Sequence, residues 1–265
     1  MKRRVALKLE YHGAGFIGWQ RQAVGVSVQG VLEQAASRLC GGVPVACIAA
    51  GRTDSRVHAS GQVAHLDLPD HLTPDTIRDA LNFHTRPHPV AVLAAAAVAA
   101  DWSARFSAVT RAYRYVIDTR RARLVLDSGR AWHVDRPLDL EAMREAARVL
   151  LGRHDFTSFR AQSCQAKSPI RTLDRLELVR ERDTIVAVVE ARSFLHHQVR
   201  NIVGTLKLVG EGRWPPGRVA VALAARDRAA AGPTAPPDGL TLVAVGYDPD
   251  PFDLPSSRPR PIGSV

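Results

Sequence analysis

Cysteine is scarce in this chain. Its 265 residues include three cysteines, Cys40, Cys47 and Cys164, which are odd in number, widely spaced and without a C-x-x-C pair. This pattern argues against a disulfide framework and against a zinc site built on cysteines. We therefore predict scattered thiols in a reducing compartment, the cytoplasm.

Long hydrophobic runs are also missing. The most apolar stretch, from Pro89 to Ala100, is mostly alanine and too short to cross a bilayer. The basic start MKRR is followed by Lys8 and Glu10, so no apolar segment of a signal peptide follows it. The sequence predicts neither a membrane segment nor export.

Acidic residues are outnumbered. The chain has 36 Lys and Arg against 26 Asp and Glu, a formal net charge of +10. Such a surplus favours polyanionic partners, either nucleic acid or an acidic membrane surface. The hydrophobic content of 46% is enough for a substantial core, in one large domain or two halves of ordinary size.

The first part of the chain mixes strands and helices. RVALKLEY (4–11) alternates in the manner of a half-buried strand, and the apolar residues of 28–39 recur three and four apart, as in an amphipathic helix. Residues 45–51, 62–68 and 90–98 are predicted strands. Thr73 and Pro74 begin a predicted helix that ends near residue 82.

The second part repeats this order approximately. Strands are predicted at 111–118, 173–179 and 184–191, and helices at 139–150 and 195–210. The predicted fold class is α+β, with two similar halves, each a mostly antiparallel sheet with helices packed on one face, flanking a central basic cleft. We place the halves at 1–108 and 109–247, and a flexible, proline-rich tail at 248–265.

One carboxylate stands out in GRTDSRVHASGQVAH, residues 51–65, because Asp54 lies among basic residues. An aspartate in such a turn most often accepts backbone hydrogen bonds. Alternatively, Arg52 could hold Asp54 ionised, ready to act as a nucleophile or general base. A glycosidase would need a second, protonated carboxyl group, and none is evident.

The same stretch resembles the G-R-T-D-x-G-V-H-A-x-G-Q-V motif of the TruA family of tRNA pseudouridine synthases. Further blocks resemble this family in the family's order: EYHGAGFIGWQRQ, SVQGVLEQA, SARFSA with RAYRYVI, GRHDFTSFRA, SFLHHQVRNIVGTL and APPDGLTL. Together they extend from about residue 4 to about residue 246.

The resemblance implies an isomerase that converts uridine to pseudouridine at positions 38, 39 and 40 of the tRNA anticodon stem-loop, without metal or cofactor. It implies that Asp54 is the catalytic nucleophile, that Tyr113 stacks on the flipped uracil and that Arg200 pairs with Asp54. Arg52 and Arg105 would bind the substrate, and the protein would be a homodimer. The alternatives are a non-catalytic tRNA-binding or tRNA-folding module and a pseudouridine synthase for another RNA.

Other basic residues have less specific roles. Several arginines in or beside the matched blocks could contact phosphate, although some must be structural: Arg21, Arg111, Arg114 and Arg160. His196 and His197 are predicted on a helix, where neighbours diverge by about 100°, so they should not face one metal ion. His58 and His65 are predicted to bond to backbone groups within the motif.

Arg56 stands where the family usually has glycine. If that position requires a positive φ, a non-glycine residue there costs roughly 1 to 2 kcal/mol.

Overall fold

A computed structural model describes residues 1–253 of the chain. Its helices are α1 (Val28–Leu39), α2 (Pro74–His84), α3 (Leu140–Arg148), α4 (Gln198–Gly210) and α5 (Arg218–Ala225). Its strands are β1 (Lys2–Tyr11), β2 (Ile48–Ala49), β3 (His58–Pro69), β4 (Val90–Ala97), β5 (Ala108–Asp118), β6 (Trp132–His133), β7 (Gly152–Asp155), β8 (Ile170–Leu173), β9 (Arg175–Glu181), β10 (Thr184–Ala191) and β11 (Leu240–Tyr247).

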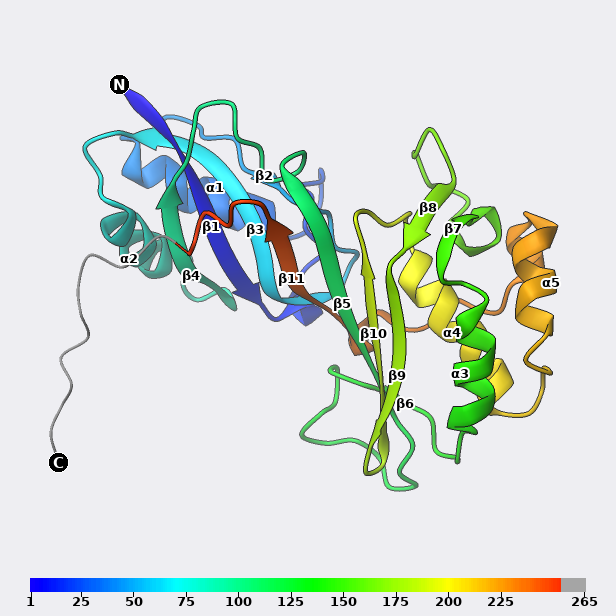
Figure 1. The fold of residues 1–265 in the computed structure, drawn as a ribbon. Helices are drawn as coiled ribbons and strands as arrows, with labels where there is room; N and C mark the ends of the chain where they lie inside the picture. The colour runs from blue at the N-terminus through cyan, green and yellow to red at the C-terminus, as the bar shows by residue number, and fades with distance from the viewer. Residues whose placement is uncertain (254–265) are drawn as a thin grey trace, which may run out of the picture.

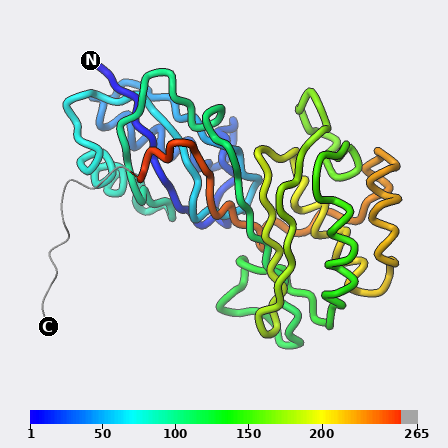
Figure 2. The backbone as a smooth tube through the Cα atoms, in the orientation of Figure 1, coloured from blue at the N-terminus to red at the C-terminus, as the bar shows by residue number. Residues whose placement is uncertain are grey.

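Most strands belong to one sheet that runs through both halves of the molecule (Figure 1). The order is β4-β1-β3-β11-β5-β10-β9, with β2 on β3 and β6 on β5, and β7 pairs separately with β8. The pairs β11–β3 and β5–β6 are parallel and the others are antiparallel. The predicted α+β class is confirmed, and β11 joins the two halves at the centre (Figure 2).

Local sequence signals account for the helix starts. Side chains of Ser27, Thr73 and Asp139 accept hydrogen bonds from backbone amides in the first turns of α1, α2 and α3. These bonds satisfy amide groups that have no partner within the helix. The predicted helix at 28–39 is confirmed at both ends.

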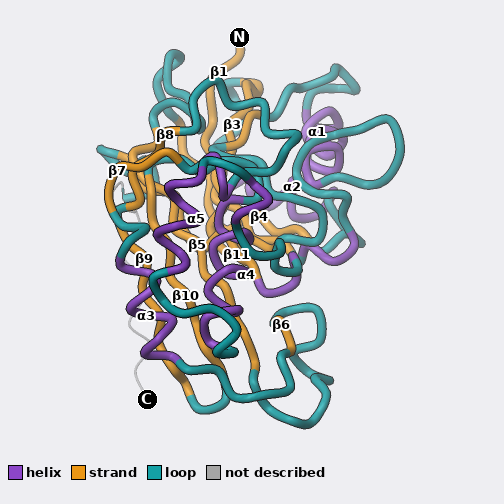
Figure 3. The backbone as a smooth tube through the Cα atoms, turned by 90° about the vertical axis from the view of Figure 1, so that its right-hand side faces the viewer, coloured by secondary structure: helices purple, strands orange, loops and turns teal. Residues whose placement is uncertain are grey.

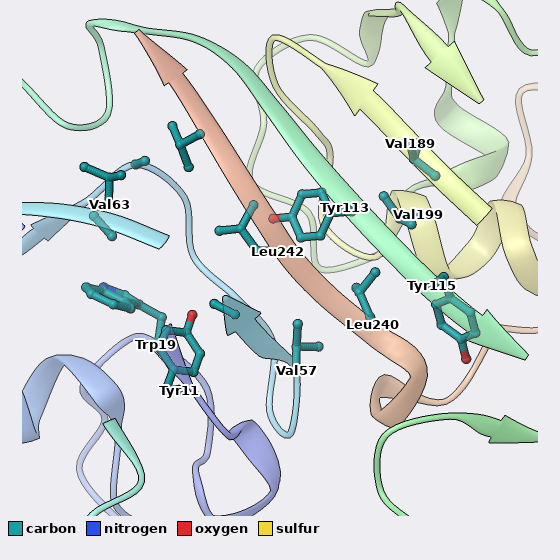
Figure 4. Close-up of a cluster of buried hydrophobic side chains, with 14 of the residues drawn as sticks. Tyr11, Trp19, Val57, Val63, Tyr113, Tyr115, Val189, Val199, Leu240 and Leu242 are labelled. Carbon is teal, nitrogen blue, oxygen red and sulfur yellow. The ribbon is translucent and has the colours of Figure 1, made fainter. Parts of the chain in front are cut away.

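The helices divide between the two halves. Helices α1 and α2 contact β3 and β4, whereas α3 and α4 cover β9 and β10, and α5 packs on α3 (Figures 1 and 3). One hydrophobic core continues from one half to the other: Tyr11 of β1, Tyr113 of β5, Val189 of β10, Val199 of α4 and Leu242 of β11 belong to it (Figure 4). The halves are therefore joined by packing as well as by strand pairing.

Several predicted elements have other bounds in the structure, and two of these differences bear on the site. Of the predicted strand at 45–51, Ile48 and Ala49 form β2. The predicted helix at 195–210 begins at Gln198, because His197 adopts a left-handed backbone conformation (φ 62°) and the preceding residues form a turn.

The remaining predictions concern the thiols, the membrane and the tail. The three cysteines are free. Within residues 1–253, no helix combines the length and the apolar character that a membrane span needs. Most of the tail predicted to be flexible, 254–265, lies outside the described residues.

Candidate active site

The loop between β2 and β3 holds Asp54 in a fixed position. The carbonyl of Thr53 accepts a hydrogen bond from the Trp19 amide at 3.0 Å, and the Thr53 hydroxyl lies 2.7 Å from the Tyr11 hydroxyl. A Cβ atom on Gly18, whose φ is 112°, would lie 2.8 Å from the Thr53 carbonyl oxygen. The close approach and the positive φ both require glycine at position 18. The segment of Gly18 and Trp19 therefore packs against the loop that carries Asp54.

Three basic side chains from the second half of the chain surround the Asp54 carboxylate. Arg200 Nη1 donates to Asp54 Oδ2 at 3.0 Å. His197 Nε2 lies 3.3 Å from the same oxygen, and His196 Nε2 lies 3.3 Å from Oδ1. The Asp54 side chain is 21% exposed, so it is largely buried but not sealed from solvent.

The carboxylate is ionised in this setting. Burial by itself raises the pKa of Asp54, but the hydrogen bond from His196, the charge of His197 and the hydrogen bond and charge of Arg200 lower it more. The net shift of the Asp54 pKa is downward. A charged oxygen is what a nucleophile or general base requires.

The two histidines have opposite shifts. The hydrogen bond to Asp54 raises the pKa of His196 above its ordinary value. Burial lowers the pKa of His197, and Arg200, His196 and Arg228 add to this effect. His196 therefore holds a proton more strongly than a free histidine does, and His197 holds it less strongly.

Our expectation that these histidines diverge was wrong. Both precede α4, in the turn that ends with the left-handed His197, and their ring centroids lie 4.0 Å apart. Ligand atoms of Asp54, His196 and His197 lie within 4.8 Å of one another, as a metal site would require. However, the guanidinium of Arg200 already bonds the carboxylate, and its positive charge opposes a cation at the same oxygen.

Tyr113 lies on β5 close to this cluster. Its side chain forms an edge-to-face contact with Phe194, with ring centroids 5.2 Å apart. Burial raises the pKa of the Tyr113 phenol, and the nearby Tyr11 and Asp54 raise it further. The residue is 9% exposed, so only a small part of the ring can meet a substrate in this conformation.

The two other predicted substrate-binding residues lie on loops. Arg52 is exposed two residues before Asp54, in a loop rather than a strand. The ion pairs of Asp54 within residues 1–253 come from His196, His197 and Arg200, so the expected bond from Arg52 is not formed. Arg105 is exposed, with its guanidinium 5.4 Å from the ring centroid of Phe106.

Arg111 is one of the arginines that we considered for contact with phosphate. In the structure it instead bonds to backbone carbonyls and holds loops together. It is 8% exposed and donates to the carbonyls of Ala50, Arg105, Ala108 and Arg192. These bonds connect the loops that carry Arg52, Arg105 and the exposed Arg192. The buried guanidinium thus fixes the backbone from which three exposed arginines extend.

Among the described residues, the other arginines form no ion pair with Asp54. Arg21 pairs with Glu33 at 3.3 Å. Arg114 points to the other face of the sheet from its neighbour Tyr113, where it lines a groove and lies 3.8 Å from Glu181. Arg160, of intermediate exposure, follows a short 3₁₀ turn at Thr157–Phe159.

Arg56 has the strained conformation that its position suggested. Its φ is 68°, in the left-handed region. Its guanidinium donates to Asp238 Oδ1 at 2.6 Å, from a segment 182 residues away. The sequence did not predict this ion pair, which connects the loop between β2 and β3 to the residues before β11.

The motif histidines bond to backbone groups, as predicted, but their partners lie outside the motif. The Gly13 amide donates to His58 Nδ1 at 3.0 Å, and His58 Nε2 lies 2.8 Å from the Gly129 carbonyl oxygen. The Ala104 amide donates to His65 Nδ1 at 3.1 Å.

Comparison of the sequence with known proteins identifies a family whose members share these residues' surroundings in the chain. The sequence model described as tRNA pseudouridine synthase matches residues 9–107 and 146–248. The chain belongs to the tRNA pseudouridine synthase family. Both matched ranges contribute to the cluster, since Asp54 lies in the first and Arg200 in the second.

Individual relatives in this family match almost end to end. The chain is 68% identical to a tRNA pseudouridine synthase A of Acidiphilium cryptum over 251 residues, 94% of this chain and 98% of the relative. It is 61% identical to that of Paramagnetospirillum magneticum, over 92% of this chain and 95% of the relative. It is 54% identical to that of Gluconobacter oxydans, over 94% of this chain and 92% of the relative.

Proposed function

We propose that this protein isomerises uridine to pseudouridine at positions 38, 39 and 40 of the tRNA anticodon stem-loop, with Asp54 as nucleophile and without metal or cofactor. The observation that carries this proposal is the ionised Asp54 carboxylate, held by Arg200 in a partly open site. Membership of the tRNA pseudouridine synthase family supplies the reaction class.

The reaction suits a single carboxylate. Uracil must leave the sugar through N1, turn and rejoin it through C5, so the enzyme has to activate one bond and retain the detached base. Asp54 would form and later release a bond to the substrate. Tyr113 would stack on the flipped uracil at the bottom of the site, consistent with its place beside Asp54.

Exposed arginines near the site would bind the RNA. Arg52 and Arg105 extend from two loops that Arg111 joins through the carbonyls of Ala50 and Arg105. Contacts between arginine and phosphate position a nucleic acid without selecting its sequence. We assign these two side chains to the phosphates that flank the target nucleotide.

The wider organisation that we propose rests on the sequence and on the family. We divide the chain into halves at 1–108 and 109–247, place the protein in the cytoplasm and expect a homodimer. Light scattering at micromolar concentration tests the last point: a mass of one chain would contradict it, and twice that mass would support it.

Nucleotide-resolution mapping tests the function itself. The pure protein is incubated with unmodified tRNA transcripts, and pseudouridine is mapped at every position. We expect new pseudouridine at positions 38, 39 and 40. Modification elsewhere or of another RNA would show a different specificity, and tight tRNA binding without any pseudouridine would identify a binding or folding module.

A further inference from the structure

An exposed aromatic side chain lies in the loop that carries Arg105. Among the described residues, the exposed aromatic side chains are Phe83 and Phe106. Phe106 is 77% exposed and follows Arg105 in the loop between β4 and β5. A single exposed phenylalanine is ordinary on a protein surface. The fixed backbone of this loop and the charges around it distinguish Phe106.

Hydrogen bonds hold the backbone on both sides of Phe106. The Ser107 amide donates to the Ser103 carbonyl at 2.9 Å, and the Ser103 amide donates to the Ser107 hydroxyl at 3.1 Å. The Tyr247 hydroxyl donates to the Ala104 carbonyl at 2.7 Å. A side chain that extends from a backbone fixed in this way loses less conformational entropy on binding than one on a loose loop. Phe106 is thus presented to solvent by a preorganised loop.

Arg111 places this loop beside the loop that carries Asp54. Its Nη2 donates to the carbonyls of Arg105 and Ala50, each at 2.8 Å, so the two loops meet at one nitrogen. Ala50 directly follows β2, in the segment that leads to Asp54. Arg111 itself shares a face of β5 with Tyr113, because alternate residues of a strand point to the same side. The exposed ring therefore lies at the border of the candidate active site.

We propose that Phe106 binds the tRNA substrate by stacking on a nucleobase beside the target uridine. The proposal rests on the proposed function, since it takes tRNA as the substrate of this site. The Arg105 guanidinium lies over the Phe106 ring, 5.4 Å from its centroid, and the ring keeps most of its surface open to solvent. A base on the open surface would complete a stack of guanidinium, ring and base.

The charges around Phe106 favour RNA over another protein surface. The exposed Arg52, Arg105 and Arg192 extend from loops whose carbonyls Arg111 bonds. A second copy of this chain has the same formal net charge of +10 and would bring further positive charge toward these arginines. The phosphates of an RNA neutralise them, while its bases supply flat surfaces for the ring.

A cycle of four affinities tests this contact. The proteins are wild type and Phe106→Leu, which keeps an apolar side chain and removes the flat ring. The RNAs are an unmodified tRNA transcript and the same transcript with one abasic nucleotide, placed in turn on either side of the target uridine. Filter binding over a range of salt concentrations gives each affinity and its salt slope, and a melting curve checks that both proteins are folded.

We expect Phe106→Leu to bind the intact transcript about 5- to 150-fold more weakly than wild type, the usual effect of losing one stacking contact. With the abasic nucleotide at the stacked position, the two proteins should bind equally. The salt slope of Phe106→Leu should equal that of wild type, because a stacked base releases no counterion. Wild-type affinity, equal weakening on every transcript, or a lower salt slope caused by displacement of Arg105 would each overturn the proposal.

Two matched variants control for the aromatic ring and for its place. Phe106→Tyr keeps a flat ring and should bind like wild type. Phe83→Leu removes the exposed ring on α2, which packs on the edge strand β4, and should also bind like wild type (Figure 1). If either variant lost as much affinity as Phe106→Leu, stacking by Phe106 would be the wrong explanation.

Two further measurements keep the conclusions apart. Light scattering compares the mass of Phe106→Leu with that of wild type, and a smaller mass would assign the ring to a protein interface and overturn the proposal. Pseudouridine formed by wild type is measured on the same intact transcript. If none were formed, the proposed function would be wrong, whereas the four affinities would still decide whether Phe106 stacks on a base.

Discussion

Arg200 donates to Asp54 across 146 positions of the chain, at 3.0 Å, and thereby joins the two matched parts of the sequence in one site. The guanidinium is fixed at its other side, since Arg200 Nε donates to the Ala235 carbonyl at 2.8 Å. With 13% of its side chain exposed, Arg200 is a partly buried charge whose main partner is a carboxylate. Such pairs lower the pKa of the acid and fix its orientation.

Replacing Arg200 should therefore change the acidic side of the pH–rate profile. Asp54 has a lowered pKa in the folded protein, so its charged form persists until the pH falls below that value. In Arg200→Gln the pKa of Asp54 rises, and the acidic limb of the single-turnover rate should move to higher pH. A limb unchanged in position would show that another group controls it.

The same shift affects stability. The pair contributes fully above the pKa of Asp54 in the unfolded chain, about 3.9, and the contribution is lost as the pH falls through the lower folded value. The free energy of unfolding of wild type and Arg200→Gln should converge in acid and differ at neutral pH.

Arg56→Gly tests the strained position in the motif loop. Glycine removes the cost of a φ of 68°, but the variant loses the ion pair with Asp238, in which the arginine side chain is 53% exposed. An exposed ion pair contributes about 0 to 1 kcal/mol to stability. Glycine also raises the conformational entropy of the unfolded chain, which lowers stability. We expect turnover to be kept and the free energy of unfolding to change by no more than about 1 kcal/mol.

Arg56→Ala is the matched control, because it loses the ion pair and keeps the strain. It should be less stable than Arg56→Gly in a melting experiment. The reverse order would show that strain is not the dominant factor, and loss of turnover in both would give Arg56 a role in the substrate complex.

Gly13 and Gly15 share one 3₁₀ turn but differ in their surroundings. A Cβ on Gly13 would lie 2.1 Å from the Val57 carbonyl oxygen, whereas a Cβ on Gly15 has nothing within 4 Å. Gly13→Ala should lower the free energy of unfolding by about 2 kcal/mol or more and displace the loop of Asp54. Gly15→Ala should have the melting temperature and the turnover of wild type. Equal losses of stability in Gly13→Ala and Gly15→Ala would contradict this packing.

The sequence predicted most elements because their signals are local. The apolar spacing of α1, the caps of α2 and α3 and the alternation of β5 are decided by neighbouring residues. The site was harder to predict. The two histidines looked like the first turn of a helix, and only the left-handed backbone at His197 shows that they precede it.

Long-range pairs could not be derived from periodicity at all. The bonds from Arg56 to Asp238 and from Arg111 to four carbonyls depend on which loops the sheet brings together. The central place of β11, the last strand in the sequence, is a property of the whole topology.

Salt dependence tests the proposed RNA contacts. The affinity for unmodified tRNA should fall steeply with salt, by about 0.7 to 0.9 in log affinity per phosphate contact and per unit of log salt. Arg52→Ala and Arg105→Ala should each reduce that slope by about this amount. Arg182→Gly, an exposed arginine with a φ of 57° in the β9–β10 turn, is the control and should leave the slope unchanged. An unchanged slope in the first two variants would remove these residues from the phosphate contacts.

Asp54→Asn tests the central claim most directly, because it keeps the size of the side chain and removes its charge. A single-turnover assay measures pseudouridine formed per enzyme, beside tRNA affinity and a melting curve. Without the nucleophile, we predict a rate lower by several orders of magnitude, tRNA affinity close to wild type and a stability change of about 1 kcal/mol at most. Pseudouridine formation at a near wild-type rate, or loss of activity only through unfolding, would contradict the account.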